Sequence, residues 1–221
     1  MRFHDRVEGG KALAAKLLRY AHRPDVIVLG LPRGGMPVAL EVARALEAPL
    51  DVLIVRKLGV PGEEELALGA IATGGGRVIN QSVVESLGIS RRVIDAVTQR
   101  EQEELKRREH AYRDARPLPT LRDRVVILVD DGIATGATMR AAVSSVRQQQ
   151  PSRIVVAVPV AAPESVQELR DLADEVMCVL EPEAFWGVGL WYEQFPQLTD
   201  DDVVTLLNAA WHEHATSERY T

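Results

Sequence analysis

The chain has 221 residues, a formal net charge of −6 and 46% hydrophobic residues, which suits one globular domain with a core of its own. The acidic balance argues against nonspecific nucleic-acid binding as the main task, because such binding needs a cationic surface. The only cysteine, Cys178, excludes an intrachain disulfide and fits a small buried side chain. Because no apolar stretch has the length of a membrane span and the first residues are charged, we expect a cytoplasmic protein without nucleic-acid or membrane partners.

Short apolar segments alternate along the chain with longer segments of helical periodicity. The apolar segments are rich in Val, Ile and Leu, as in strands covered on both faces. In chain order we expect a helix at Gly9 to Tyr20, a strand at Val26 to Gly30, a helix at Met36 to Leu46, strands at Asp51 to Val55 and Val125 to Val129, a helix at Thr138 to Gln149, a strand at Ile154 to Pro159, a helix at Pro163 to Ala173 and a strand at Glu175 to Leu180. The alternation predicts an α/β fold, a parallel sheet flanked by helices. In the first helix, Leu13, Leu17 and Leu18 are expected to face inward.

Two insertions interrupt this alternation. Leu66 to Asn80 contains two apolar runs around three glycines, Gly74 to Gly76, which predicts a β-hairpin with a glycine turn. Ser90 to Arg116 has a helical pattern, and its part from Arg100 onward carries six basic and five acidic residues. A solvated helix held by ion pairs three or four residues apart is one interpretation of that pattern, and a lid over an active site is the other.

The most informative stretch runs from Val126 to Thr138. Four apolar residues form the end of a buried strand, and Asp130 and Asp131 follow at its carboxyl end, where open α/β sheets bind ligands. A loop of small residues then leads into a helix, so its free amide groups and the helix dipole favour an anion, and Gly136 can adopt a positive φ. The hydroxyls of the loop threonines add hydrogen-bond donors. The sequence therefore predicts a pocket for a phosphate monoester beside two carboxylates that accept hydrogen bonds from vicinal hydroxyls, as in a ribose 5-phosphate.

The stretch Asp-Asp-Gly-Ile-Ala-Thr-Gly-Ala-Thr resembles the phosphoribosyl-diphosphate-binding motif of the type I phosphoribosyltransferases, and most closely that of the adenine-type enzymes. The resemblance implies a parallel core, a small hood that receives a nitrogen base, and a divalent cation, usually Mg²⁺, carried with the diphosphate. It assigns the ribose to Asp130 and Asp131. The residues implied to bind the 5-phosphate are Ile133, Ala134, Thr135, Gly136, Ala137 and Thr138.

Two earlier segments are similar to the diphosphate-binding parts of this family. Leu31 to Gly35 follows the first strand and resembles the diphosphate loop, which commonly holds a non-proline cis peptide; its binding residues are Arg33, Gly34 and Gly35. Arg56 and Lys57 end the second predicted strand and resemble a cationic pair that neutralises the diphosphate. A plain strand-to-helix turn and a solvated strand end are the alternatives for these two segments.

The segment from Ala184 to Tyr192 is similar to the base-binding segment of the hypoxanthine-type enzymes. There an aromatic ring stacks on the purine, which makes Phe185 or Trp186 the candidate; closing the core against the terminal helix is an equal alternative for these rings. The chain has Ala134 where those enzymes carry an acid, and no lysine after the fourth strand in Val160 to Pro163, so the acceptor base is not identified. Glu183 and Glu193 lie near the expected hood and fit surface acids better than a base-binding role.

The resemblance implies an enzyme, a pentosyltransferase that transfers the 5-phosphoribosyl group from phosphoribosyl diphosphate to a nitrogenous base in nucleotide salvage, with Asp130, Asp131 and Lys57 in the chemistry. The alternative is a non-catalytic sensor of phosphoribosyl diphosphate or a nucleotide; the cations named above favour the enzyme. We expect one domain over residues 1–221, with a hood from the N-terminal segment and about 181–221, and a helical insertion at about 90–117. The family commonly forms dimers, so a homodimer is an open alternative. We assign no protein ligand to the metal, since His212 and His214 fit a polar terminal tail.

Overall fold

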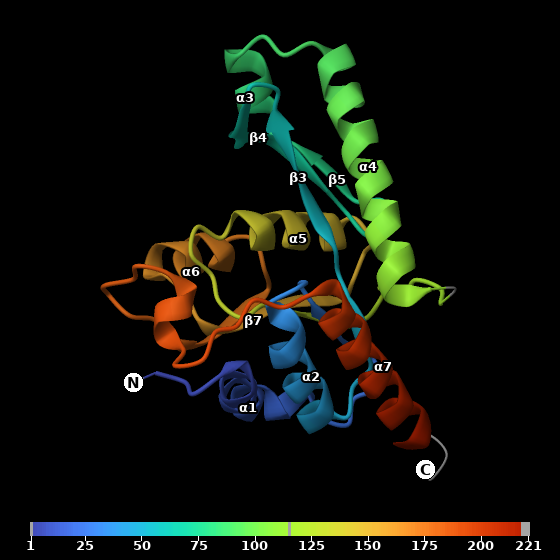
Figure 1. Ribbon diagram of the computed structural model, residues 1–221, viewed down its shortest axis with the longest axis vertical. Coiled ribbons are helices and arrows are strands. Elements are labelled where there is room, and N and C mark those ends of the chain that lie inside the picture. Colours follow the sequence, from blue (N-terminus) through green and yellow to red (C-terminus); the bar gives the residue numbers. More distant parts are fainter. Residues whose placement is uncertain (1, 115, 218–221) are drawn as a thin grey trace.

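The computed structural model describes residues 2–114 and 116–217, and its centre is a five-stranded parallel sheet (Figure 1). The strand order is β2-β1-β6-β7-β8, so the chain adds β2 on one side of β1 and then β6, β7 and β8 on the other side. The strands are β1 (Val26–Gly30), β2 (Leu50–Val52), β6 (Val125–Val129), β7 (Arg153–Val160) and β8 (Glu175–Leu180). This arrangement confirms the predicted fold class and places the carboxyl ends of β1 and β6 side by side.

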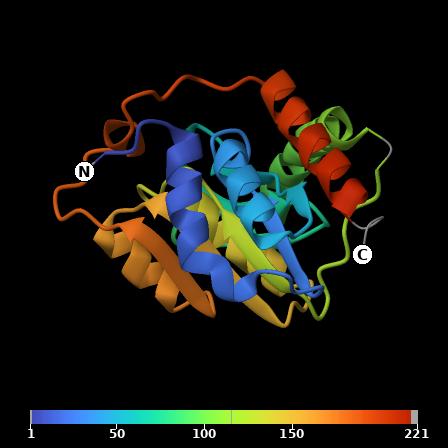
Figure 2. The same cartoon turned by 90° about the horizontal axis from the view of Figure 1, so that it is seen from below.

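Helices cover both faces of this sheet (Figures 1 and 2). They are α1 (Arg6–Leu17), α2 (Gly35–Leu46) and α7 (Asp200–Ser217) on one face and α5 (Ala137–Arg147) and α6 (Pro163–Arg170) on the other. Alternate side chains of each strand point to opposite faces: Val28 of β1 joins the first core, whereas Leu29 joins the second. Both faces are buried, which is the physical reason why the strands are continuous apolar runs.

The N-terminal helix begins earlier than its apolar pattern indicated. Asp5 caps α1 by accepting a hydrogen bond from the amide of Glu8, so the helix starts at Arg6. Leu13 and Leu17 are buried as predicted, but Leu18 is 57% exposed, so that prediction was wrong. The helix tightens into a 3₁₀ turn at residues 18–20, and this change of period turns Tyr20 inward in place of Leu18.

An arm projects from the core between β2 and β6 (Figure 1). It contains an antiparallel sheet of β3 (Val55–Val60), β4 (Glu63–Ala72) and β5 (Arg77–Ile79), followed by α3 (Gln81–Ser86) and α4 (Arg91–Arg113). The β4–β5 pair is the expected glycine hairpin, and α4 is the expected long helix. The strand predicted at Asp51 to Val55 was wrong, because β2 ends at Val52 and Val55 already begins β3 in the second sheet.

The arm helix is anchored on both the arm and the core. Its buried side chains Ile94, Val97 and Leu105 belong to the first core, which β3 and β4 share. At its C-terminal end, Tyr112 donates a hydrogen bond to Asp200 at the start of α7. The insertion therefore has a packed apolar side as well as the surface ion pairs that its charge pattern predicted.

The C-terminal part of the described chain is also more ordered than the sequence indicated. His212 and His214 stand in α7, where a polar tail was expected, and Trp211 donates a hydrogen bond to the carbonyl of Leu50 at 3.0 Å. Cys178 is buried as expected, and burial raises the pKa of its thiol to about 12. None of the helices in the described residues combines the length and the apolar character that crossing a bilayer requires.

Candidate functional site

Two adjacent carboxylates at the end of β6 form the floor of the candidate site. The amide of Asp131 donates to Oδ1 of Asp130 at 2.8 Å. Burial, and then the neighbouring charge of Asp131, raise the pKa of Asp130 well above its ordinary value. Burial also raises the pKa of Asp131, while the Arg6 guanidinium acts in the opposite direction. Asp130 therefore holds a proton more readily than an exposed acid, and Asp131 is the better charged acceptor of the two.

The loop after β1 packs directly on this acid pair. The amide of Leu31 donates to the carbonyl of Val129 at 2.8 Å, which ties the loop to the end of β6. A Cβ on Gly34 would overlap the carboxylate of Asp131, so only glycine allows this approach. The peptide between Pro32 and Arg33 is cis, the feature expected from the resemblance. The side chain of Arg33 is 42% exposed, and its Nη1 lies 4.0 Å from Oδ1 of Asp200.

The loop between β6 and α5 presents bare backbone amides. Gly136 has a φ of 69° and forms the N-cap of α5 without a side-chain capping bond. Among the described residues, the amides of 134–136 have no hydrogen-bond acceptor. The amide of Ile133 differs, since it donates to the carbonyl of Val160 at 2.9 Å. Thr135 and Thr138 are both exposed, so the loop offers amides and hydroxyls to an anion at the start of a helix.

Arg6 is a site residue that the sequence interpretation missed. From the first turn of α1 its Nε donates to Oδ2 of Asp131 at 2.8 Å, across 125 positions of sequence. Its Nη1 donates to the carbonyl of Pro196 at 2.8 Å, and its guanidinium lies 3.7 Å from the centre of the Phe195 ring. The sequence offered one signal for this role. Arg6 lies seven residues before Leu13, on the inward face of α1, and a charge on such a face needs a buried partner.

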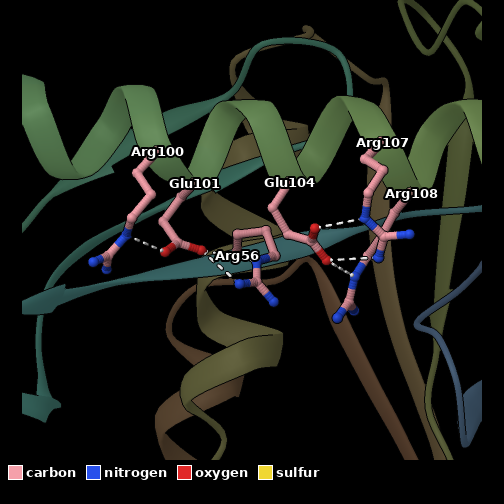
Figure 3. A network of polar contacts seen from close by, with 6 residues as sticks. All are labelled: Arg56, Arg100, Glu101, Glu104, Arg107 and Arg108. Atoms are coloured by element: carbon pink, nitrogen blue, oxygen red, sulfur yellow. Dashed lines mark hydrogen bonds and ion pairs between the residues drawn. The ribbon is translucent and has the colours of Figure 1, made fainter.

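The predicted cationic pair lies on the arm. Arg56 of β3 donates to Oε2 of Glu101 on α4 from Nη2 at 2.6 Å and from Nε at 3.0 Å (Figure 3). Lys57 borders a different cavity of about 380 Å³, together with Thr138 and Arg140 of α5. Neither cation borders the space next to Arg33. The reason is the early end of β2, because both residues then belong to β3 of the second sheet.

The segment after β8, which was expected to form the hood, contacts the acid pair. Tyr192 donates a hydrogen bond from its hydroxyl to the carbonyl of Asp131. Phe185 packs against the small cluster of Phe3, Val160 and Tyr192, whereas Trp186 is 86% exposed. Between the hood and the β1 loop lies a cavity of about 360 Å³; its lining residues are Arg6, Arg33, Gly34, Asp131, Phe195, Pro196, Gln197 and Leu198. Of these aromatic rings, Phe195 lines this cavity with Asp131, whereas Phe185 and Trp186 do not line it.

The two carboxylates are the candidate protein ligands for Mg²⁺. Among residues 2–114 and 116–217, no three His, Cys, Asp or Glu side chains gather in a way that would hold a metal ion. Mg²⁺ commonly takes one or two carboxylates and fills its octahedron with water and substrate oxygens. Asp130 and Asp131 fit that requirement for an ion that arrives with a diphosphate.

Comparisons with known proteins agree with this geometry. The family model described as phosphoribosyl transferase domain matches residues 3–193. Two Mycobacterium tuberculosis proteins with the provisional name phosphoribosyl transferase are 45% identical over 213 residues, which are 96% of this chain and 48% of each relative. The chain thus spans about half the length of these curated relatives. The crystal structure of TT1426 from Thermus thermophilus has 44% identity and a TM-score of 0.84, and the match covers 94% of this chain and 98% of that chain.

A purine phosphoribosyltransferase from Pyrococcus horikoshii is more distant, with 22% identity and a TM-score of 0.47 over 88% of this chain and 93% of that chain. The family model and the relatives with at least 44% identity suffice for an assignment, because together they cover the acid pair, the loops beside it and most of the hood. On this evidence the chain belongs to the type I phosphoribosyltransferase family.

Proposed function

We propose that the chain transfers the 5-phosphoribosyl group of phosphoribosyl diphosphate to a nitrogenous base, and that it acts in nucleotide salvage. The observation that carries the proposal is the position of the Asp130–Asp131 pair between two elements that offer hydrogen-bond donors to an anion. On one side are the acceptor-free amides of 134–136 at the start of α5, and on the other is the loop with Arg33. A sugar with a phosphate at one end, a diol in the middle and a diphosphate on C1 matches this order of groups.

The ribose 5-phosphate half of the substrate would bind at the β6–α5 loop. The amides of 134–136 and the hydroxyls of Thr135 and Thr138 supply donors for the phosphate, and the helix dipole favours its charge. Asp131 accepts hydrogen bonds from the ribose diol, and Asp130 supports it through the bond to the Asp131 amide. The result is a sugar held at both its phosphate and its diol, with C1 directed at the incoming base.

In the reaction a nitrogen lone pair of the base forms the new bond to C1. The C1–O bond breaks, its electron pair leaves on the diphosphate, and the N–H proton of the base passes to solvent. Arg33 stabilises the charge that develops on the leaving group, and the carboxylate of Asp131 favours the positive charge that develops on the ribose. When bound, Mg²⁺ would neutralise diphosphate charge beside Asp130 and Asp131. Arg56 and Lys57 help to neutralise the charge of the leaving diphosphate only if the arm moves toward the core, since neither borders the cavity at Arg33.

A sensor of phosphoribosyl diphosphate is the second candidate function. It is favoured by the pairing of Arg56 with Glu101, which leaves fewer cations at the diphosphate loop than the sequence indicated. Turnover distinguishes the two candidates, because a sensor binds phosphoribosyl diphosphate without consuming it.

The experiment that tests the proposal is a panel of nucleobases incubated with phosphoribosyl diphosphate and Mg²⁺, with released diphosphate as the readout. We expect release with at least one base.

Asp131→Asn is expected to weaken phosphoribosyl diphosphate binding about tenfold or more in calorimetry, because a charged hydrogen-bond acceptor for the diol is lost. Asp171→Asn, a change of the same charge at the exposed C-cap of α6, serves as the control. Binding that is equal in Asp131→Asn and the wild type would contradict the site.

A further inference from the structure

Arg6 carries a buried positive charge inside the candidate site. It is 8% exposed and contacts three separate parts of the chain: the Asp131 carboxylate, the Pro196 carbonyl and the Phe195 ring. Such a set of contacts holds the planar guanidinium in one orientation. If Arg6 had only a structural role, we would expect its N–H groups to donate hydrogen bonds to other protein groups.

The hydrogen bonds of Arg6 to described residues use only part of its guanidinium group. A guanidinium has five N–H groups, and the two hydrogen bonds of Arg6 start from Nε and Nη1. Nη2 has no hydrogen-bond partner among the described residues. It is not fully buried either, unlike the buried side-chain atoms of the described residues that lack a partner. Nη2 is therefore accessible to solvent, and Arg6 lines the 360 Å³ cavity together with Arg33 and Gly34.

The cavity has the chemistry of an anion site. Two guanidinium groups border it, Arg33 from the loop after β1 and Arg6 from α1. Fork-shaped donors of this kind match the oxygens of a phosphate group. A stacked base is a poorer occupant, because Arg6 covers one face of Phe195 and Tyr192 stacks on the same ring at 5.1 Å between centroids.

We propose that Arg6 is a second arginine of the leaving-group site and holds the diphosphate of phosphoribosyl diphosphate together with Arg33. This inference rests on the proposed function. Asp131 balances the charge of Arg6 before substrate binds, and Nη2 then donates to the diphosphate. As the C1–O bond breaks and its electron pair leaves on the diphosphate oxygen, both arginines stabilise the added charge.

The test measures binding of inorganic diphosphate and of ribose 5-phosphate separately, by calorimetry with Mg²⁺ present. Arg6→Gln is expected to weaken diphosphate binding about tenfold or more, and ribose 5-phosphate binding less than about threefold. Arg6→Lys keeps the charge without the fork, so its loss for diphosphate is expected to lie between those of the wild type and Arg6→Gln. Lys11→Gln, which removes an exposed charge from the same helix, should change neither affinity.

Two outcomes would overturn the proposed role of Arg6 and leave the proposed function intact. Diphosphate binding that is equal in wild type, Arg6→Gln and Arg6→Lys would exclude contact with the leaving group. An equal loss of both ligands would show that Arg6 acts only by orienting Asp131. If Arg6→Gln does not fold, as judged by circular dichroism, Arg6→Lys decides the question. A wild-type protein that binds neither diphosphate nor phosphoribosyl diphosphate would refute the proposed function as well.

Discussion

At the scale of single residues, the acid pair is held in an environment that opposes its charge. Asp130 and Asp131 are adjacent, burial raises the pKa of both, and Arg6 compensates only Asp131 by direct contact. Ionised Asp130 therefore lowers the stability of the folded chain. The residue is expected to be retained for binding rather than for stability, a common relation at functional sites.

Asp130→Asn is expected to stabilise the protein while lowering its activity. The asparagine can still accept the hydrogen bond from the Asp131 amide, and it removes the penalty of a buried charge. Because the folded pKa is raised above 3.8, the unfolding free energy of the wild type falls as pH rises from about that value to the folded pKa. Denaturant unfolding in the presence of a chelator should thus show a difference in unfolding free energy between the wild type and Asp130→Asn. This difference should grow as pH rises through this window and disappear in acid. A less stable variant at pH 7 would contradict this account.

At the scale of secondary-structure elements, the end of α4 meets the start of α7 next to the loop that carries Arg33. The Tyr112 hydroxyl donates to Oδ1 of Asp200 at 2.6 Å, and Arg33 lies 4.0 Å from the same oxygen. Burial and the bond to Asp200 raise the pKa of Tyr112 to about 12, so the phenol stays a donor at physiological pH. One carboxylate thus connects the arm helix with the loop that carries Arg33. The lid role of the insertion stays a prediction, and this connection is where a movement of α4 would reach the site.

Tyr112→Phe tests this connection between elements. Losing one hydrogen bond to a charged group should cost about 1.5–3 kcal/mol of unfolding free energy and increase amide hydrogen exchange in the C-terminal turns of α4. Tyr20→Phe is a matched control, because Tyr20 donates at 2.9 Å to Glu175 in β8, the edge strand at the other end of the sheet from β2. Its stability loss should be similar, without a change of exchange in α4. Unchanged exchange in Tyr112→Phe would mean that packing alone anchors the helix.

At the scale of the whole molecule, a buried ion pair joins the arm to the central sheet. Nε of Arg113, the last residue of α4, donates to Oδ1 of Asp51 in β2 at 2.8 Å, and its Nη2 donates to the carbonyl of Val52. Burial raises the pKa of Asp51 even though Arg113 lowers it. The pair therefore adds little net stability but makes each partner dependent on the other.

Replacing one partner is expected to be worse than replacing both. Asp51→Asn leaves the charge of Arg113 buried without its carboxylate and should cost about 3 kcal/mol. The double variant Asp51→Asn with Arg113→Met should recover part of this loss, which denaturant unfolding of the wild type, both single variants and the double variant would measure as a coupling energy. Additive losses would show that the two side chains act independently. Circular dichroism of each variant at low denaturant checks that the fold is kept.

Features encoded within a short stretch could be predicted from the sequence. The bounds of β1, β6 and β8 and the glycine hairpin were predicted, as was the loop between β6 and α5. Each depends on neighbouring residues: a continuous apolar run, a glycine turn, or small residues at a helix start. Prediction failed where one element follows another closely. At Leu18 the α-helix changes to a 3₁₀ turn, and at Val55 a strand of the second sheet begins shortly after β2.

The sequence by itself determined the parallel α/β core and the Asp130–Asp131 motif at the end of β6, because both are written in local periodicity and residue type. Only the tertiary structure decided which distant side chains meet that motif. Arg6 reaches Asp131 because α1 packs across the sheet, and Arg56 reaches Glu101 because β3 leaves the core with the arm. Such contacts depend on the packing of elements against one another, which no pattern of neighbouring residues records.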